Sequence, residues 1–110
     1  MSSRAKGKRG ELEVAEFLRA LGYEAARSQQ YNGRDGGADV VCSIAGMHIE
    51  VKRTERLQPY TFMQQAVRDA KNNAVPTVWM RSNNREWLLT IRAMDMFRFA
   101  EMLHAARVSP

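Results

Sequence analysis

Residues 38–52, ADVVCSIAGMHIEVK, form the stretch that decides the fold. Two short apolar runs rich in β-branched residues, 38–44 and 47–51, flank the dipeptide Ala45-Gly46. Short runs of this kind on either side of a small, glycine-containing turn are typical of antiparallel strands. The stretch therefore predicts a β-hairpin, with its tight turn at Ala45-Gly46.

Three ionisable residues interrupt the apolar runs of this hairpin. Pairing across the turn would put Asp39 approximately opposite residue 51 or 52. Glu50 and Lys52 are two residues apart and would emerge on the same face of their strand. Two carboxylates on neighbouring strands offer the oxygen ligands that Mg²⁺ prefers, with a lysine beside them to offset phosphoryl charge. A turn aspartate and a solvated Glu-Lys pair are the alternative interpretation.

The remaining elements follow from hydrophobic periodicity and from turn residues on both sides of the hairpin. Before it, a helix is predicted over 7–21, stopped by Gly22, and then a strand over 23–26 and a loop over 28–37. After it, the pattern predicts a helix over 61–73, strands over 77–80 and 87–92, and a helix over 94–106. The order α-β-β-β-α-β-β-α predicts an α/β fold with a mixed central β-sheet flanked by helices.

The length and composition of the chain limit the class of protein. The 110 residues suit one domain, 1–110, and argue against two. No run approaches the roughly 18 apolar residues of a membrane span, and the N-terminus lacks the apolar segment of a secretory signal. A single cysteine, Cys42, excludes an intrachain disulfide. We therefore expect a cytoplasmic protein, in a bacterial, archaeal or phage-infected cell, with no membrane partner.

The charge balance points to a polyanionic partner. The 17 Lys and Arg residues exceed the 12 Asp and Glu residues, which gives a net charge of +5 and favours nucleic acid. Residues 1–8 form a basic N-terminal arm of a kind that is often disordered and can track phosphates. The side chains expected to contact DNA are those of Arg4, Lys6, Lys8, Arg9, Arg27, Arg34 and Arg53.

A basic nucleic-acid-binding module without catalysis would explain this charge equally well. It gives no reason for Asp39 and Glu50, which repel phosphate unless a cation lies between them. The acidic residues therefore favour cutting over binding alone.

Two sets of residues also resemble a known family. Asp39 followed by Glu50-Val51-Lys52 looks like the core of the PD-(D/E)XK nucleases, although Ala38 stands where the family motif has its proline. Upstream, Lys6-Gly7-Lys8-Arg9-Gly10-Glu11 opens a helix, and Leu21-Gly22-Tyr23 and Arg27 follow. This arrangement is similar to archaeal-type Holliday junction resolvases and their phage relatives, over about residues 6–65.

The resemblance implies a restriction-endonuclease-like core and an Mg²⁺-dependent endodeoxyribonuclease, with Mn²⁺ able to substitute. Branched DNA such as a Holliday junction would be its substrate. Paired cuts in a two-fold substrate favour a homodimer. Apolar surface on the last strands or on the final helix would form its interface. The resemblance places Glu11, Asp39, Glu50 and Val51 around the metal, with Lys52 assisting catalysis.

Several residues have a second interpretation. Glu11 is equally typical of a first-turn glutamate favoured by the helix dipole. Gln65, which matches a family glutamine that faces the site better than Gln64 does, also fits an ordinary surface position. His48 and His104 lie far apart without evident partners, so structural roles are expected for both.

The predicted loop 28–37 contributes two weaker candidates. Ser28 is a possible participant in the site, because the loop loosely matches a substrate loop of the family. Asp35 is a second candidate acid, but its glycine-rich setting favours a loop role.

Overall fold

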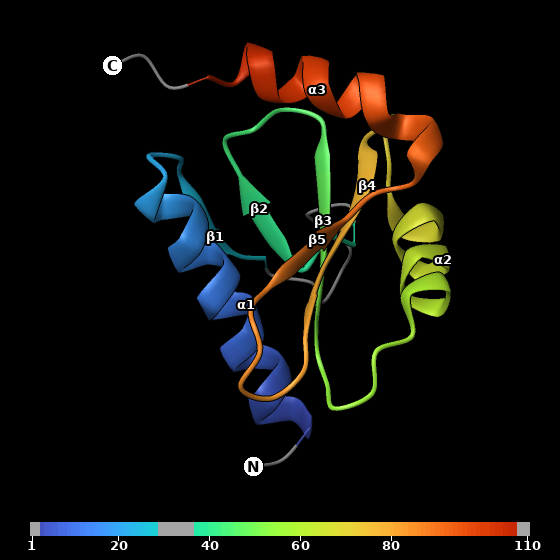
Figure 1. Cartoon of the computed structure of the whole chain (residues 1–110). Helices are drawn as coiled ribbons and strands as arrows, with labels where there is room; N and C mark the ends of the chain where they lie inside the picture. Colours follow the sequence, from blue (N-terminus) through green and yellow to red (C-terminus); the bar gives the residue numbers. More distant parts are fainter. Residues whose placement is uncertain (1–2, 29–36, 108–110) are drawn as a thin grey trace.

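The computed structural model describes residues 3–28 and 37–107, and it confirms the α/β class (Figure 1). The elements, in chain order, are α1 (Ser3–Ala20), β1 (Ala25–Arg27), β2 (Val40–Cys42), β3 (Met47–Arg53), α2 (Pro59–Asp69), β4 (Val75–Arg81), β5 (Leu88–Thr90), the 3-10 helix η1 (Ala93–Asp95) and α3 (Met96–Ala105). The predicted order of helices and strands is confirmed.

The strands form one mixed sheet in the order β1-β2-β3-β4-β5. The central pair, β3 and β4, is parallel, and the other neighbours are antiparallel. A parallel pair needs a crossover connection, which α2 provides. The sheet therefore has two interior-facing sides, and each needs a helix to cover it.

The predicted hairpin between β2 and β3 is confirmed, but its predicted register is wrong. Val40 pairs with Ile49, so Asp39 lies opposite Glu50 and not opposite residue 51 or 52. The cause is the connection: residues 43–46 all lie outside the strands, and Ile44 turns into the core at 3% exposure. A four-residue connection moves the pairing relative to a two-residue turn.

The helices cover the sheet on both sides, and α3 lies across the end of the sheet away from the N-terminus (Figure 1). The α1 side carries the larger apolar cluster, in which Val14 and Leu18 pack with Val51 and Trp79. The α2 side carries a smaller cluster formed by Met63, Ala66, Val78 and Met80. Alternate residues of β3 and β4 thus serve opposite layers, as the pleat of a strand requires.

Two helix boundaries differ from the predicted ones by four residues, and the other helix ends differ by one or two. α1 begins at Ser3 and not near Gly7, so most of the basic N-terminal arm belongs to its first turns. α2 ends at Asp69, because Ala70 adopts an extended conformation with ψ of 131°, and Asn72 and Asn73 follow with positive φ angles of 56° and 60°. Within residues 3–28 and 37–107, no helix is long and apolar enough to cross a bilayer.

Candidate active site

Asp39 directly precedes β2, and hydrogen bonds to the main chain of β3 hold it there. Its own N–H donates to the carbonyl of Ile49 over 2.8 Å, and its Oδ2 accepts from the N–H of Val51 over 2.7 Å. A carboxylate that accepts a backbone N–H is held in one orientation. Asp39 is therefore held beside Glu50, its opposite neighbour on β3.

Glu50 lies in the interior of the protein, with a side chain that is fully buried. Its Oε1 is 3.0 Å from Nε2 of His48, while its Oε2 is buried without a hydrogen-bond partner in the part of the chain that the structure describes. Burial raises the pKa of Glu50 to about 7. His48 opposes this rise, and the carboxylate of Asp39 adds to it through its charge and by hydrogen bonding to the protonated form.

Lys52 lies on the same side of β3 as Glu50, and α2 positions its ammonium group. Nζ donates to Oε1 of Gln65 over 2.7 Å and lies 5.6 Å from the ring centroid of Phe62. α2 is the crossover between the parallel strands β3 and β4. It packs on the side of the sheet to which Lys52 points. The sequence resemblance proposed Gln65 rather than Gln64 for this region, and the structure brings Gln65 to Lys52.

Glu11 reaches the same region from α1 but is turned toward Arg27. Its Oε1 accepts from Nε of Arg27 over 2.9 Å. Burial raises the pKa of Glu11, the bond to Arg27 and the charge of Lys52 lower it, and the charge of Asp39 raises it. These effects link Glu11 electrostatically to the site. Its interpretation as a first-turn glutamate is wrong, because α1 begins eight residues earlier and its first turn holds no acidic residue.

The arrangement provides a two-carboxylate centre. Among residues 3–28 and 37–107, no group of three or more His, Cys, Asp or Glu side chains is close enough to hold an ion. The Asp39–Glu50 pair nevertheless fits a divalent cation, since Oε2 of Glu50 is a buried acceptor without a donor. Mg²⁺ commonly takes one or two carboxylates and completes its shell with water and phosphate oxygens. The side chain of Val51 lies in the apolar core, so only its main chain can contribute.

The other sequence candidates fall outside this centre. Ser28 is buried and donates from its hydroxyl to the carbonyl of Ala38, which fixes the chain entering β2. Arg34 and Asp35 lie outside the described residues. The expectation that His48 has no partner is wrong. Its contact with Glu50 follows from their spacing of two residues on one strand, which puts both side chains on one face.

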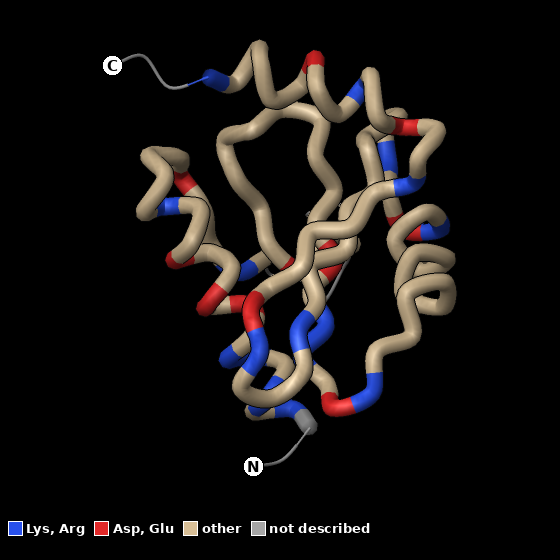
Figure 2. The backbone as a smooth tube through the Cα atoms, in the orientation of Figure 1, with Lys and Arg blue, Asp and Glu red and all other residues tan. Residues whose placement is uncertain are grey.

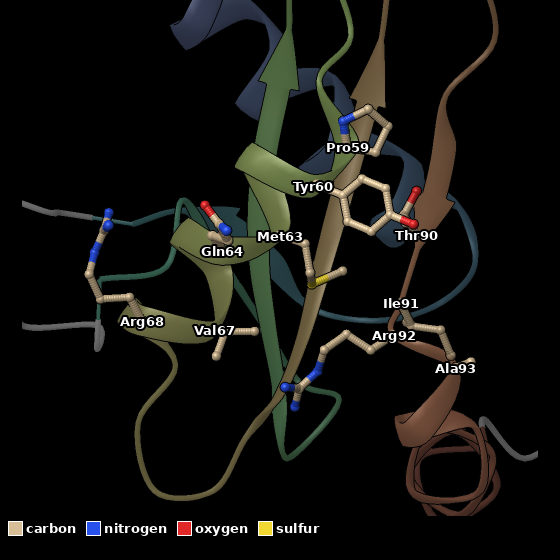
Figure 3. A pocket seen from close by; sticks show the side chains of 10 residues that line it. All are labelled: Pro59, Tyr60, Met63, Gln64, Val67, Arg68, Thr90, Ile91, Arg92 and Ala93. Carbon is tan, nitrogen blue, oxygen red and sulfur yellow. The ribbon is translucent and has the colours of Figure 1, made fainter.

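A groove elsewhere on the molecule does not overlap with this centre. It has a volume of about 770 Å³ and lies between α2 and the segment that joins β5 to η1 (Figure 3). Apolar side chains such as Met63, Val67 and Ile91 line it, with Arg68 and Arg92 among its polar residues. Its lining residues include no carboxylate, so it lacks the negatively charged ligands of a typical Mg²⁺ site.

Comparisons with known proteins agree with the geometry. The model of the family described as "Phage putative PDDEXK endonuclease" matches residues 2–107. Among solved structures, Hjc, a Holliday junction resolvase from the archaeal hyperthermophile Archaeoglobus fulgidus, is similar with a TM-score of 0.57 and 21% sequence identity. That match covers 76% of this chain and 73% of Hjc. No curated protein matches. The likeness to Hjc establishes a shared restriction-endonuclease-like fold, and the family match establishes that this chain belongs to the phage PDDEXK endonucleases.

Proposed function

We propose that this protein is a divalent-metal-dependent endonuclease that hydrolyses DNA phosphodiester bonds. One observation carries the proposal: a fully buried Glu50 with an unpartnered oxygen lies beside Asp39 and on the same side of β3 as Lys52. A buried carboxylate oxygen without a hydrogen-bond donor, such as Oε2 of Glu50, is energetically costly unless a cation binds it. Such a centre on a basic protein suits the hydrolysis of a polyanion.

Each residue has a distinct role in this proposal. Asp39 and Glu50 hold Mg²⁺, or Mn²⁺ in its place, with the main chain of Val51 and with Glu11 from α1. The bound ion supplies a water of lowered pKa and neutralises charge on the phosphate. Lys52 offsets the negative charge that develops on the phosphoryl group, and Gln65 keeps its ammonium in place.

We further propose that the substrate is branched DNA such as a Holliday junction. The fold shared with Hjc, a Holliday junction resolvase, supports this choice. So does the size of the chain, because 110 residues suit contacts with the DNA backbone better than base-specific readout. The residues expected to contact the DNA backbone are those predicted from the sequence: Arg4, Lys6, Lys8, Arg9, Arg27, Arg34 and Arg53.

A homodimer that acts in the cytoplasm completes the proposal, because a two-fold junction needs two cuts. Large apolar side chains near the C-terminal end of the chain support such an interface. Met94 and Phe97 are 77% and 76% exposed, and Leu88, Leu89 and Met96 are also exposed. Exposed apolar groups on neighbouring elements are typical of association surfaces.

The test uses labelled four-way junction, flap and linear duplex DNA, each with Mg²⁺, Mn²⁺ or EDTA. We expect cleavage only with the metals, and faster cleavage of the junction than of the duplex. Asp39→Ala and Glu50→Ala should abolish cleavage, while Glu16→Ala, an exposed acid on α1, should leave it unchanged.

Cleavage that persists in EDTA, or that survives both active-site substitutions, would rule out the metal centre. DNA binding without cleavage under all conditions would favour the non-catalytic binding module. Sedimentation of the free protein tests the dimer separately, and a monomer at all concentrations would contradict it.

A further inference from the structure

A second cluster of charged residues lies on the α1 side of the sheet, next to the end of β3 that carries Lys52. Arg53 follows Lys52 directly, and the alternation of a strand turns its side chain to the opposite side, with Val51. Arg53 pairs in register with Arg81, the last residue of β4. The two arginine side chains therefore lie side by side where the parallel strands end.

Glu13 and Trp87 hold Arg81 in place, and Glu13 also lies near Arg53. Oε1 of Glu13 accepts from Nη1 of Arg81 over 3.0 Å and from Nε1 of Trp87 over 3.2 Å. Oε2 of Glu13 is 3.9 Å from Nε of Arg53. The guanidinium carbon of Arg81 also lies 5.7 Å from the ring centroid of Trp87, within the range of a cation–π contact.

The cluster is largely enclosed. Exposure of the side chains is 15% for Arg53, 20% for Arg81 and 27% for Glu13. α1 approaches closely here, because a Cβ atom added to Gly10 would meet Cβ of Arg53 at 3.1 Å and the indole of Trp87 at 3.4 Å. Guanidinium groups that are already ordered lose little conformational entropy when they bind a ligand.

The charge of the cluster points to an anionic ligand. Glu13 sets one negative charge against the two positive charges of Arg53 and Arg81. The basic residues Arg4, Lys6, Lys8 and Arg9 lie at the same end of the molecule, in the first turns of α1, where Figure 2 shows Lys and Arg gathering near the N-terminus. An ion pair that served only to fasten α1 to the sheet would need no surplus of cations.

We propose that Arg53 and Arg81, held by Glu13 and Trp87, bind a backbone phosphate of the DNA strand beside the phosphate that is cut. This inference rests on the proposed function and adds Arg81 as a phosphate-binding residue and Glu13 as a positioning residue. A strand that crosses the end of β3 passes from Lys52 on one side to Arg53 on the other. Arginine recognises phosphate through paired N–H groups, which a lysine lacks.

The binding test measures the affinity for a labelled four-way junction by fluorescence anisotropy, in EDTA and between 50 and 200 mM NaCl. Each phosphate contact contributes about 0.9 to the slope of log affinity against log salt. Arg81→Gln should reduce the steepness of this slope by about 1, so that its affinity falls about 4-fold less over this range than that of the wild type. Arg81→Lys should keep the slope.

Arg107→Gln removes the same charge at the other end of the chain and is the matched control, which should keep the wild-type slope. An unchanged slope for both Arg81→Gln and Arg53→Gln in variants with wild-type unfolding curves would overturn the proposal. If Arg81→Gln does not fold, Arg53→Gln still tests it.

Glu13→Gln tests the positioning role. It removes a negative charge near the DNA, so charge alone predicts equal or tighter binding. If Glu13 orients the guanidinium groups, the cleavage rate at saturating DNA should fall several-fold while affinity is kept. A lower melting temperature with an unchanged rate would show that Glu13 only fastens α1. A wild type that binds DNA but does not cut it refutes the proposed function and leaves the binding test valid.

Discussion

Replacing Glu50 with glutamine should make the metal-free protein more stable. Glutamine has nearly the same shape and cannot ionise, so it removes the cost of a buried charge. It can also donate to Asp39 and accept from His48 in the positions that Glu50 occupies. The wild type bears this cost because Glu50 is fully buried beside a second carboxylate.

The size of the effect follows from the pKa of Glu50, about 7 in the fold against a usual 4.5. The folded protein holds the proton more tightly than the unfolded chain, so stability falls as pH rises from 4.5 to 7 and stays low above that range. The difference corresponds to about 3 kcal/mol of unfolding free energy at pH 8.5. Below pH 4.5 the advantage of glutamine should vanish.

Urea unfolding in EDTA at pH 4.5 and 8.5 measures this difference. We expect Glu50→Gln to exceed the wild type by about 3 kcal/mol at pH 8.5 and to equal it at pH 4.5. Glu16→Gln, on the exposed face of α1, should match the wild type at both pH values. Equal stability of Glu50→Gln and the wild type at pH 8.5 would refute the reasoning.

Three other predictions concern the metal, the lysine and α1. Mg²⁺ at a hundredfold excess over its Kd should stabilise the wild type by about 3 kcal/mol in thermal melts, and Asp39→Asn should abolish this gain. Lys52→Gln should slow single-turnover cleavage about 100-fold or more with an almost unchanged melting temperature, and an unchanged rate would contradict its role. Gly7→Ala should raise the unfolding free energy by about 0.5–1 kcal/mol, because nothing lies within 4 Å of the added Cβ. Gly10→Ala should lose that gain to its 3.1 Å contact with Arg53, and equal effects of the two substitutions would contradict this packing.

The hairpin shows how far the sequence alone can lead. Short apolar runs rich in β-branched residues on both sides of Ala45-Gly46 identified β2 and β3 and placed Asp39 near Glu50, because a central strand such as β3, buried on both faces, has a nearly continuous apolar sequence. The predicted register was wrong because Ile44 does not belong to either strand. Its side chain packs in the core, at 3% exposure, and the connection between the strands is longer than predicted. An apolar residue next to a turn looks the same in the sequence whether or not it belongs to the strand.

The site depends on contacts that no local pattern encodes. Spacing puts His48 on the same face as Glu50, but their hydrogen bond needs both side chains to be buried together. The start of α1 was placed too late because residues 3–6, Ser-Arg-Ala-Lys, were assigned to the basic N-terminal arm and carry no apolar stripe that would indicate a helix. The pairing of Glu13 with Arg81 joins residues 68 positions apart, beyond any reading of short-range spacing.

The hydrogen bond from the N–H of Val51 to Oδ2 of Asp39 links the main chain of a central strand to the charge of a site carboxylate. A proton or a cation that binds to that carboxylate also changes the electron density at the amide. The ¹⁵N–¹H resonance of Val51 should therefore shift as Asp39 becomes occupied, before any bond in DNA is broken. The backbone thus carries a spectroscopic probe of the site, one that follows occupancy in the ¹⁵N-enriched wild-type protein without an attached reporter group or a substrate.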